Sequence, residues 1–258
     1  MKKLKAIIVY KHPKNSNESK VCRPLDTNGI KIKYSWKNSL TKKDFNGFDF
    51  VVAIGGDGTA LSASHYLVGR PLLAVNSNPK NSEGALTTIS VDVLDKKLKD
   101  IKEGNYEVEK LERIEVSING RKQDILALNE VFIANEKAYL SSKYHIKFKG
   151  GGSKVEEDQI SSGLIFSTGS GSTAWFKSAG GQPFGVGEKC IKMLVREPYI
   201  RKILRFSILE KTIHEEDSII VVPHTNAVLA IDSIREIKLN KDDKVKIKIS
   251  RKPLLRIR

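Results

Sequence analysis

The stretch FDFVVAIGGDGTALSASHYLVG, residues 48–69, constrains the fold of this chain more than any other. Its apolar start is typical of a strand buried on both faces of a parallel sheet. Its second part predicts a helix that Gly69 closes. Gly55, Gly56 and Gly58 therefore connect a strand to a helix, which places them at the carboxyl edge of an open α/β sheet, where ligands usually bind.

In the rest of the first third, segments whose apolar residues have strand spacing alternate with segments whose apolar residues have helical spacing. The runs KAIIVY, KIKYSW and RPLLAVN are strand-like, and SVDVLDKKLKDIKEG has apolar residues at helical spacing. Ser90 is the expected N-cap of that helix and Gly104 its expected end. This rhythm predicts a doubly wound α/β domain with a mostly parallel sheet over residues 1–104.

From about Asn105 the pattern changes to short strand-like segments. YEVEKLERIEVSING and RKQDILALNEVFIAN meet at Asn119-Gly120, a strong signal for a two-residue hairpin turn. Further segments continue in the same style, and helical material is expected only near residues 173–178. We therefore expect a β-rich domain over residues 105–258, with the C-terminal RKPLLRIR as a candidate to pack back on the first domain.

The formal net charge of +15 favours anionic partners such as nucleotides. A solvated, lysine-rich surface explains the same charge equally well. No segment resembles a nucleic-acid-binding motif, and no apolar run approaches the roughly 18 residues that span a bilayer. We therefore expect no specific nucleic-acid partner and no membrane association.

Cysteine and histidine are too sparse for a metal site built by the protein alone. Cys22 and Cys190 are far apart in the sequence, and the histidines show none of the spacings of paired metal ligands. Disulfide bonds are not expected either, so the expected compartment is the reducing cytoplasm.

The glycine loop fits neither common phosphate motif. It has no lysine at the P-loop position, and Leu61 occupies the third glycine position of a dinucleotide fingerprint. Asp57 would repel phosphate oxygens unless it faced a hydroxyl group to deprotonate or a bound Mg²⁺. A kinase supplies both. The alternative is that Asp57 only caps the following helix.

Three segments, taken together, resemble the NAD kinase family. GGDGT occurs in those kinases and also in diacylglycerol kinases, sphingosine kinases and phosphofructokinases. The segment LNE, residues 128–130, and SSGLIFSTGSGSTAWFKSAGG, residues 161–181, match the family's later motifs in the same order. The pair Ser161-Ser162 replaces the usual Gly-Asp, and AVNSNPKNSEGAL replaces another common motif. Both changes are similar to the NADH-using branch of plants and mitochondria.

The resemblance implies a transferase that moves the terminal phosphoryl group of ATP to the 2′-hydroxyl of the adenosine ribose of NAD⁺ or NADH, producing NADP(H). It implies Mg²⁺ or another divalent cation bound with ATP, and a homodimer or homotetramer. A GGDGT-type lipid kinase and a non-catalytic NAD(H)-binding regulator are the alternatives. Polyphosphate is an open alternative to ATP as the donor.

The same resemblance assigns the site residues. Asp57 is the expected base on the ribose hydroxyl. The residues expected to shape the phosphate loop are Gly55, Gly56, Gly58 and Thr59. The residues expected to bind the dinucleotide are Asn129, Glu130, Ser162, Thr173, Ala174, Trp175 and Ser178. Asp232 is a weaker match to a late Asp-Gly turn. Ser162 removes a carboxylate near the nicotinamide, which predicts dual use of cationic NAD⁺ and of NADH, whose reduced ring is neutral.

Overall fold

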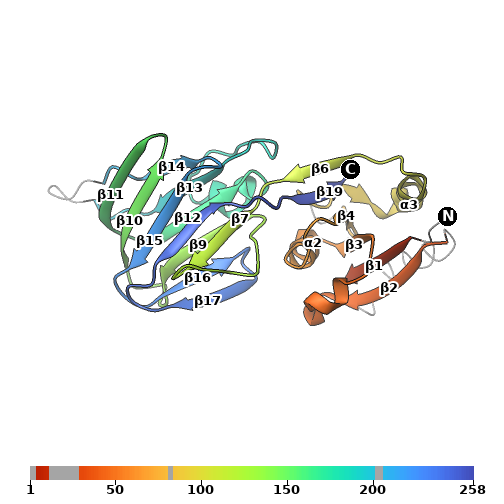
Figure 1. The fold of residues 1–258 in the computed structure, drawn as a ribbon, viewed down its shortest axis with the longest axis horizontal. Helices are drawn as coiled ribbons and strands as arrows, with labels where there is room; N and C mark the ends of the chain where they lie inside the picture. Colours follow the sequence, from red (N-terminus) through yellow and green to blue (C-terminus); the bar gives the residue numbers. More distant parts are fainter. Residues whose placement is uncertain (1–3, 12–28, 81–83, 201–205) are drawn as a thin grey trace. The chain divides into compact units, whose positions relative to one another are not determined.

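The computed structural model describes residues 4–11, 29–80, 84–200 and 206–258. The chain forms two compact units, one from Met1–Leu111 with Pro253–Arg258 and the other from Glu112–Lys252. Figure 1 shows the elements of each unit. Within these ranges, no helix has the length and apolar character needed to cross a membrane.

The first unit is built on a seven-stranded sheet with the strand order β2-β1-β3-β4-β19-β6, and β5 pairs with β4. All of its pairings are parallel except that of β19 with β6. The strands are β1 (Lys5–Tyr10), β2 (Lys31–Trp36), β3 (Phe50–Gly55), β4 (Pro71–Asn76), β5 (Ile89–Ser90), β6 (Val108–Leu111) and β19 (Leu254–Ile257). The helical elements are η1 (Lys37–Ser39), η2 (Lys42–Phe45), α2 (Asp57–Ser64), η3 (Val91–Val93) and α3 (Leu94–Glu103).

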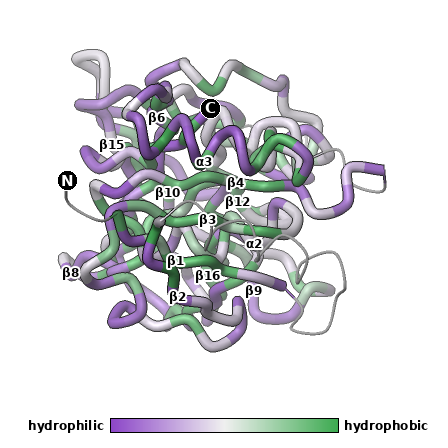
Figure 2. The backbone as a smooth tube through the Cα atoms, turned by 90° about the vertical axis from the view of Figure 1, so that its right-hand side faces the viewer, coloured by the Kyte–Doolittle hydropathy of each residue, from purple (hydrophilic) through white to green (hydrophobic). Residues whose placement is uncertain are grey.

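The middle strands of this sheet are apolar on both faces because other elements cover them. Ile8, Val52 and Leu73 are completely buried in one core cluster. Leu98 of α3 belongs to the same cluster. Figure 2 shows β1, β3 and β4 as continuous hydrophobic segments, whereas α3 alternates between hydrophilic and hydrophobic residues. The continuous apolar runs in the sequence therefore correspond to the interior strands of a parallel sheet, as predicted.

Two helices differ in length from the sequence-based expectation. The helix expected to continue to Gly69 ends at Ser64, because the next residues form tighter turns, in which the amide of Leu67 donates to the carbonyl of Ser64. The helix expected to begin after Ser90 starts with the 3-10 turn η3, and Ser90 makes no side-chain capping bond. Gly104 ends α3 in the left-handed conformation (φ 80°), as expected.

The second unit consists of two six-stranded antiparallel sheets, with the orders β11-β10-β15-β18-β7-β8 and β14-β13-β12-β9-β16-β17. Their apolar faces share one core, which includes Val116 and Tyr144 of the first sheet and Val131 and Leu164 of the second. The sheets therefore pack face to face as a sandwich. The strands of the first sheet are β7 (Ile114–Ile118), β8 (Arg121–Lys122), β10 (Ser142–Gly150), β11 (Ser153–Ser161), β15 (Ser218–Pro223) and β18 (Val245–Ile249). Those of the second are β9 (Glu130–Asn135), β12 (Gly163–Thr168), β13 (Ile191–Arg196), β14 (Glu210–Ile213), β16 (Ala227–Ile231) and β17 (Arg235–Leu239).

The predicted combination of an α/β domain and a β-rich domain is confirmed. The hairpin signal at Asn119-Gly120 is correct, since both residues have positive φ and join β7 to β8. The helical material lies in the short π-helical turn η4 (Ser172–Phe176). Contacts place the division at Leu111/Glu112 rather than after residue 104, because β6 belongs to the first sheet. The C-terminal strand β19 lies in that sheet as well, between β4 and β6.

Candidate active site

The glycine loop follows β3 directly and leads into α2. Gly55 has a φ of 153°, and a Cβ added there would lie 2.5 Å from Oγ1 of Thr59, so only glycine fits. Gly56 is the N-cap of α2 and provides no side chain to cap the helix. The N–H groups at the start of α2 therefore lie at the carboxyl edge of the sheet. The amide of Thr59 already donates to the carbonyl of Gly56 (2.8 Å), which leaves the amides of Asp57 and Gly58 for a ligand.

The carboxylate of Asp57 does not cap its own helix. Its Oδ2 accepts a hydrogen bond from the amide of Ala85 (2.8 Å), and its Oδ1 accepts from the amides of Leu86 and Thr87 (both 3.0 Å). The hydroxyl of Thr87 donates to Oδ1 as well (3.1 Å). The capping alternative is therefore not supported. The segment at residues 85–87 fixes the orientation of the carboxylate, and the described contacts leave Oδ2 one lone-pair direction for a further donor.

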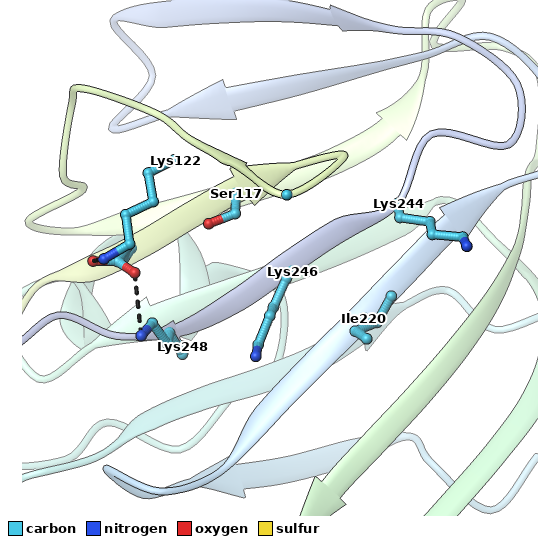
Figure 3. A pocket seen from close by; sticks show the side chains of 8 residues that line it. Ser117, Lys122, Ile220, Lys244, Lys246 and Lys248 are labelled. Atoms are coloured by element: carbon cyan, nitrogen blue, oxygen red, sulfur yellow. Dashed lines mark hydrogen bonds and ion pairs between the residues drawn. The ribbon is translucent and has the colours of Figure 1, made fainter.

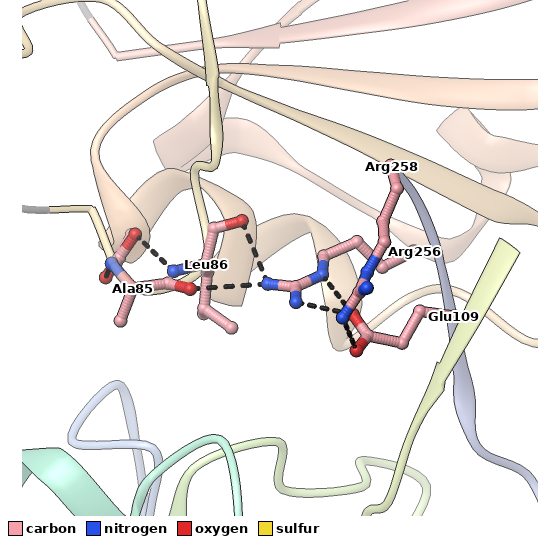
Figure 4. Close-up of polar contacts among 6 residues, drawn as sticks. Ala85, Leu86, Glu109, Arg256 and Arg258 are labelled. Atoms are coloured by element: carbon pink, nitrogen blue, oxygen red, sulfur yellow. Dashed lines mark hydrogen bonds and ion pairs between the residues drawn. The ribbon is translucent and has the colours of Figure 1, made fainter. Parts of the chain in front are cut away.

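The segment that holds Asp57 is itself held by the C-terminal strand. Arg256 donates from Nη1 to the carbonyls of Ala85 (3.3 Å) and Leu86 (3.4 Å), as Figure 4 shows. Its Nε donates to Glu109 on β6 (3.0 Å), and Arg258 pairs with the same carboxylate. Burial opposes ionisation of Glu109, but the hydrogen bonds from Arg258 and Arg256 outweigh it and lower the pKa of that carboxyl.

Two lysines reach the glycine loop from neighbouring strands. Lys11 follows β1, and a Cβ added at Gly55 would lie 3.6 Å from its Cβ. Lys37 follows β2, and a Cβ added at Gly58 would lie 3.3 Å from its Nζ. Burial and, to a smaller extent, the charge of Lys11 lower the pKa of Lys37. Neither lysine was predicted, because a P-loop carries its lysine within the loop, whereas these two follow other strands.

In the second unit, Asp232 organises the Asn129-Glu130 pair. Its buried carboxylate accepts hydrogen bonds from the amides of Leu128 (2.8 Å), Asn129 (2.7 Å) and Glu130 (3.0 Å). Asp232, the weaker match to a late Asp-Gly turn, therefore supports the backbone of the predicted Asn129-Glu130 pair. The hydroxyl of Ser233 donates to Oε1 of Glu130 (3.1 Å).

The Asn129-Glu130 pair contains two unusual polar groups. Glu130 is only 4% exposed, and burial together with the charge of Asp232 raises its pKa to about 7. The side-chain oxygen Oδ1 of Asn129 is buried and accepts no hydrogen bond from the described residues. A buried acceptor without a donor is costly, so this oxygen is suited to accept a hydrogen bond from a ligand.

The turn η4 lies against the same pair. A Cβ added at Gly171 would lie 2.2 Å from the carbonyl oxygen of Asn129, so glycine is required for this close approach. Thr173, Ala174 and Trp175 follow on η4, and Ala174 has a non-helical backbone (φ −92°, ψ −122°). Thr173, Ala174 and Ser178 are exposed, and the hydroxyl of Ser178 donates to the carbonyl of Ala174 (3.3 Å).

Trp175 belongs to a cluster of two aromatic rings and one cation. Its ring centroid lies 4.5 Å from that of Phe132, and the guanidinium of Arg196 lies 5.5 Å from Trp175 and 5.6 Å from Phe132. Ser162 is exposed beside this cluster, and its amide donates to the carbonyl of Arg196 (2.9 Å). Phe132 and Arg196 were not predicted, although Phe132 lies two residues after Glu130 on the same face of β9.

The structure thus groups the predicted residues in two sets, one in each unit. The first set is Gly55, Gly56, Asp57, Gly58 and Thr59. The second is Asn129, Glu130, Ser162, Thr173, Ala174, Trp175 and Ser178. No group of three or more His, Cys, Asp or Glu side chains in the described ranges is arranged to hold a metal ion. Cys190 is a buried free thiol, whereas Cys22 lies outside the described residues.

A hollow on the first sheet of the sandwich contains none of the predicted residues. It has a volume of about 380 Å³ and is lined by lysines of β8 and β18 and the chain before it, with Glu115 of β7. Figure 3 shows Lys122, Lys246 and Lys248 around it. Glu115 pairs with Lys122 (3.1 Å) and Lys248 (3.3 Å), so part of the charge is already neutralised. We interpret this hollow as part of the solvated basic surface.

Two family models each match one part of the chain. Residues 3–106 match the ATP-NAD kinase N-terminal domain, and residues 128–258 match the ATP-NAD kinase C-terminal domain. The chain is similar to a probable NADH kinase of Oryza sativa subsp. japonica, with 29% identity over 67% of this chain and 59% of that protein. The match therefore spans less than two thirds of the length of this relative.

Two solved structures have the same fold. The crystal structure of an NAD kinase from Archaeoglobus fulgidus in complex with ATP has a TM-score of 0.80 and 25% identity, covering 99% of this chain and 94% of that one. Yeast NADH kinase complexed with NADH also has a TM-score of 0.80, with 16% identity over 99% of this chain and 83% of that one.

Proposed function

The chain belongs to the NAD kinase family, and on that premise we propose that it transfers the terminal phosphoryl group of ATP to the 2′-hydroxyl of the adenosine ribose of NAD⁺ or NADH. The observation that carries this proposal is the fixed carboxylate of Asp57 beside a glycine loop at the N-terminus of α2. An acid and a phosphate-accepting backbone are the two parts that such a transfer needs.

In the proposed reaction, the 2′-oxygen attacks the γ-phosphorus of ATP while its proton moves to Oδ2 of Asp57. The bond from the γ-phosphorus to the bridging oxygen breaks, and ADP leaves with the electron pair. Oδ2 is suited to this role because, among the described residues, only the Ala85 amide donates to it, whereas Oδ1 accepts three donors. Positioning and charge neutralisation would supply most of the rate, as in other phosphoryl transfers.

The second set of residues is proposed to bind the dinucleotide. The buried Oδ1 of Asn129 and the carboxyl group of Glu130 are suited to ribose hydroxyls or amide groups. Thr173, Ala174 and Ser178 present an exposed surface on η4, and Trp175 provides a flat ring for stacking.

We further propose that the protein uses NADH as well as NAD⁺. Ser162 has no carboxylate to attract a cationic nicotinamide. Its amide donates to the backbone carbonyl of Arg196, whose guanidinium lies over Trp175 and pairs with Glu197 (3.2 Å). Without a carboxylate at this position, the site has no charge there that favours the positively charged oxidised ring over the neutral reduced ring. The similarity to a probable NADH kinase supports the same proposal.

Several accompanying proposals concern the assembly and the metal. A divalent cation, Mg²⁺ or a similar ion, is proposed to enter as part of the Mg-ATP substrate, because the glycine loop offers it only the remaining lone pair on Oδ2 of Asp57. We also propose a homodimer or homotetramer in the cytoplasm. Lipid phosphorylation and non-catalytic NAD(H) binding gain no support from the comparisons.

The test is to incubate the purified protein with Mg-ATP and either NAD⁺ or NADH, and to measure the phosphorylated dinucleotide. We expect product from both, and Asp57→Asn is expected to lower kcat by about 100-fold or more, since an amide cannot take the proton. Asn at this position still accepts three of the four donors through its oxygen, so the fold should remain. Absence of product from the wild-type protein would contradict the proposed function, and undiminished turnover in Asp57→Asn would contradict the role of Asp57.

A further inference from the structure

Two lysines and a helix N-terminus meet at one edge of the first sheet because of the strand register. Tyr10 of β1 is paired with Trp36 of β2 and with Ile54 of β3. The next residue on each of the three strands is therefore at the same edge, and these residues are Lys11, Lys37 and Gly55. The indole Nε1 of Trp36 donates to the carbonyl of Lys11 (3.2 Å), which holds the two strand ends together.

This edge concentrates positive charge. In the described part of the chain, neither lysine forms an ion pair with Asp or Glu. The N-terminus of α2 carries a further partial positive charge. The carboxylate of Asp57 in the loop is turned toward residues 85–87 and receives its hydrogen bonds there. Like charges at short range destabilise a fold, so this arrangement indicates a site for an anion.

A buried hydroxyl group is a second, independent sign of a ligand. Thr59 lies in the first turn of α2 and is only 1% exposed. Its Oγ1 has no hydrogen-bond partner among the described residues and is directed at Gly55, since a Cβ added to Gly55 would lie 2.5 Å from it. Buried hydroxyl groups are nearly always hydrogen-bonded, so this one beside the loop is suited to a ligand oxygen.

We propose that Lys11 and Lys37, together with the first turn of α2, bind the phosphate chain of the phosphoryl donor. This inference rests on the proposed function for the identity of the donor, whereas the anion site stands on the geometry. The lysines substitute in space for the lysine that a P-loop carries within its own sequence. Lys37, whose Nζ lies over Gly58, carries most of the effect, and Lys11 adds to it from β1.

The first test measures binding without turnover. Tripolyphosphate is titrated into the wild-type protein and into Lys37→Gln, Lys11→Gln and Lys31→Gln at physiological salt. Lys31 is a matched control, because it lies at the other end of β2, about 20 Å away, and its substitution removes the same charge. We expect Lys37→Gln to weaken binding about tenfold, Lys11→Gln to weaken it less, and Lys31→Gln to leave it within about twofold. Lys37→Arg should retain most of the affinity.

The second test separates donor from acceptor. In Lys37→Gln, the KM for ATP, or for polyphosphate if that is the donor, should rise about tenfold, and the KM for NAD⁺ or NADH should stay within about twofold. Unchanged tripolyphosphate affinity in Lys37→Gln, or an equal loss in Lys31→Gln, would overturn the site. A rise confined to the KM for the dinucleotide would overturn the assignment to the donor. If tripolyphosphate binds as expected but no phosphorylated dinucleotide forms, the site stands and the proposed function fails.

Discussion

Glu130 is buried beside a second carboxyl group, Asp232, and both cannot be charged without a cost in free energy. Its pKa of about 7 in the folded protein is higher than its value of 4.5 when exposed. Because the folded pKa is raised, the stabilising contribution is fully present below about pH 4.5 and is lost as the pH rises through about 7. The difference corresponds to roughly 3 kcal/mol.

We therefore expect the free energy of unfolding to fall between about pH 4.5 and pH 7, and Glu130→Gln to remove most of this slope. Glutamine has a similar shape and cannot ionise, and the hydroxyl of Ser233 can still donate to its oxygen. The measurement is urea unfolding of both proteins across this pH range. An identical slope in the two proteins would show that Glu130 does not titrate there.

At single residues, the sequence indicated candidates for the chemistry but not the contacts that position them. GGDGT and Asn129-Glu130 indicated candidate residues, but the partners of Asp57 lie 28–30 positions further along the chain. Hydrogen bonds over such separations follow from the fold and not from a local motif. The same limit applies to Asp232, which contacts residues more than a hundred positions away.

At the level of elements, β19 carries two arginines with different environments. The side chain of Arg256 is 7% exposed and contacts both Glu109 and the carbonyls of Ala85 and Leu86. Arg258 is 56% exposed and contacts Glu109 but neither carbonyl. Variants of the two arginines can therefore be compared. Both lose an ion pair with Glu109, but only a variant of Arg256 also loses the hydrogen bonds to the segment that holds Asp57.

We expect Arg256→Gln to destabilise the protein by about 3 kcal/mol, because it leaves a largely buried carboxylate with a single partner. Arg258→Gln should cost less than about 1 kcal/mol, since the side chain of Arg258 is exposed and Arg256 remains as a partner of Glu109. Hydrogen–deuterium exchange of the amides at residues 85–87 should be faster in Arg256→Gln and unchanged in Arg258→Gln. Equal exchange in the two variants would contradict a role of Arg256 in holding this segment.

Helix and strand types were predictable where the apolar period was long, as in α3 and β3. The edge that carries Lys11 and Lys37 was not, because it depends on the register of β1, β2 and β3. A sequence shows that a lysine follows an apolar strand, but not which other strand ends at the same level.

At the level of the whole molecule, the first sheet includes one strand that precedes the second unit in the sequence and one that follows it. The strand β6 precedes Glu112–Lys252 in the sequence and β19 follows it, and the two pair with each other. The sequence predicted that the C-terminal RKPLLRIR packs back on the first domain, but not that it forms a strand between β4 and β6. Such pairing connects residues that are far apart in the chain, for example Leu254 and Leu111, and no local pattern encodes it.

Removal of residues 254–258 is expected to unfold the first unit selectively. The sheet would lose the strand between β4 and β6, together with the arginines that contact Glu109. The second unit has a core of its own and should persist. Hydrogen exchange should therefore show lost protection in β1, β3 and β4 and retained protection in β9 and β12. Retained protection in both units would show that the first sheet is stable without β19.

The position of β19 also has a consequence for synthesis of the protein. The ribosome makes the complete sandwich before it makes the strand that closes the first sheet. Until β19 emerges, Pro71 and Leu72 of β4 therefore lack their strand partner, and the carbonyls of residues 85 and 86 have no guanidinium to hold them. A chain released before that point would leave that edge open to pairing with another strand. It would also lack Arg256, which holds the segment that orients the carboxylate of Asp57.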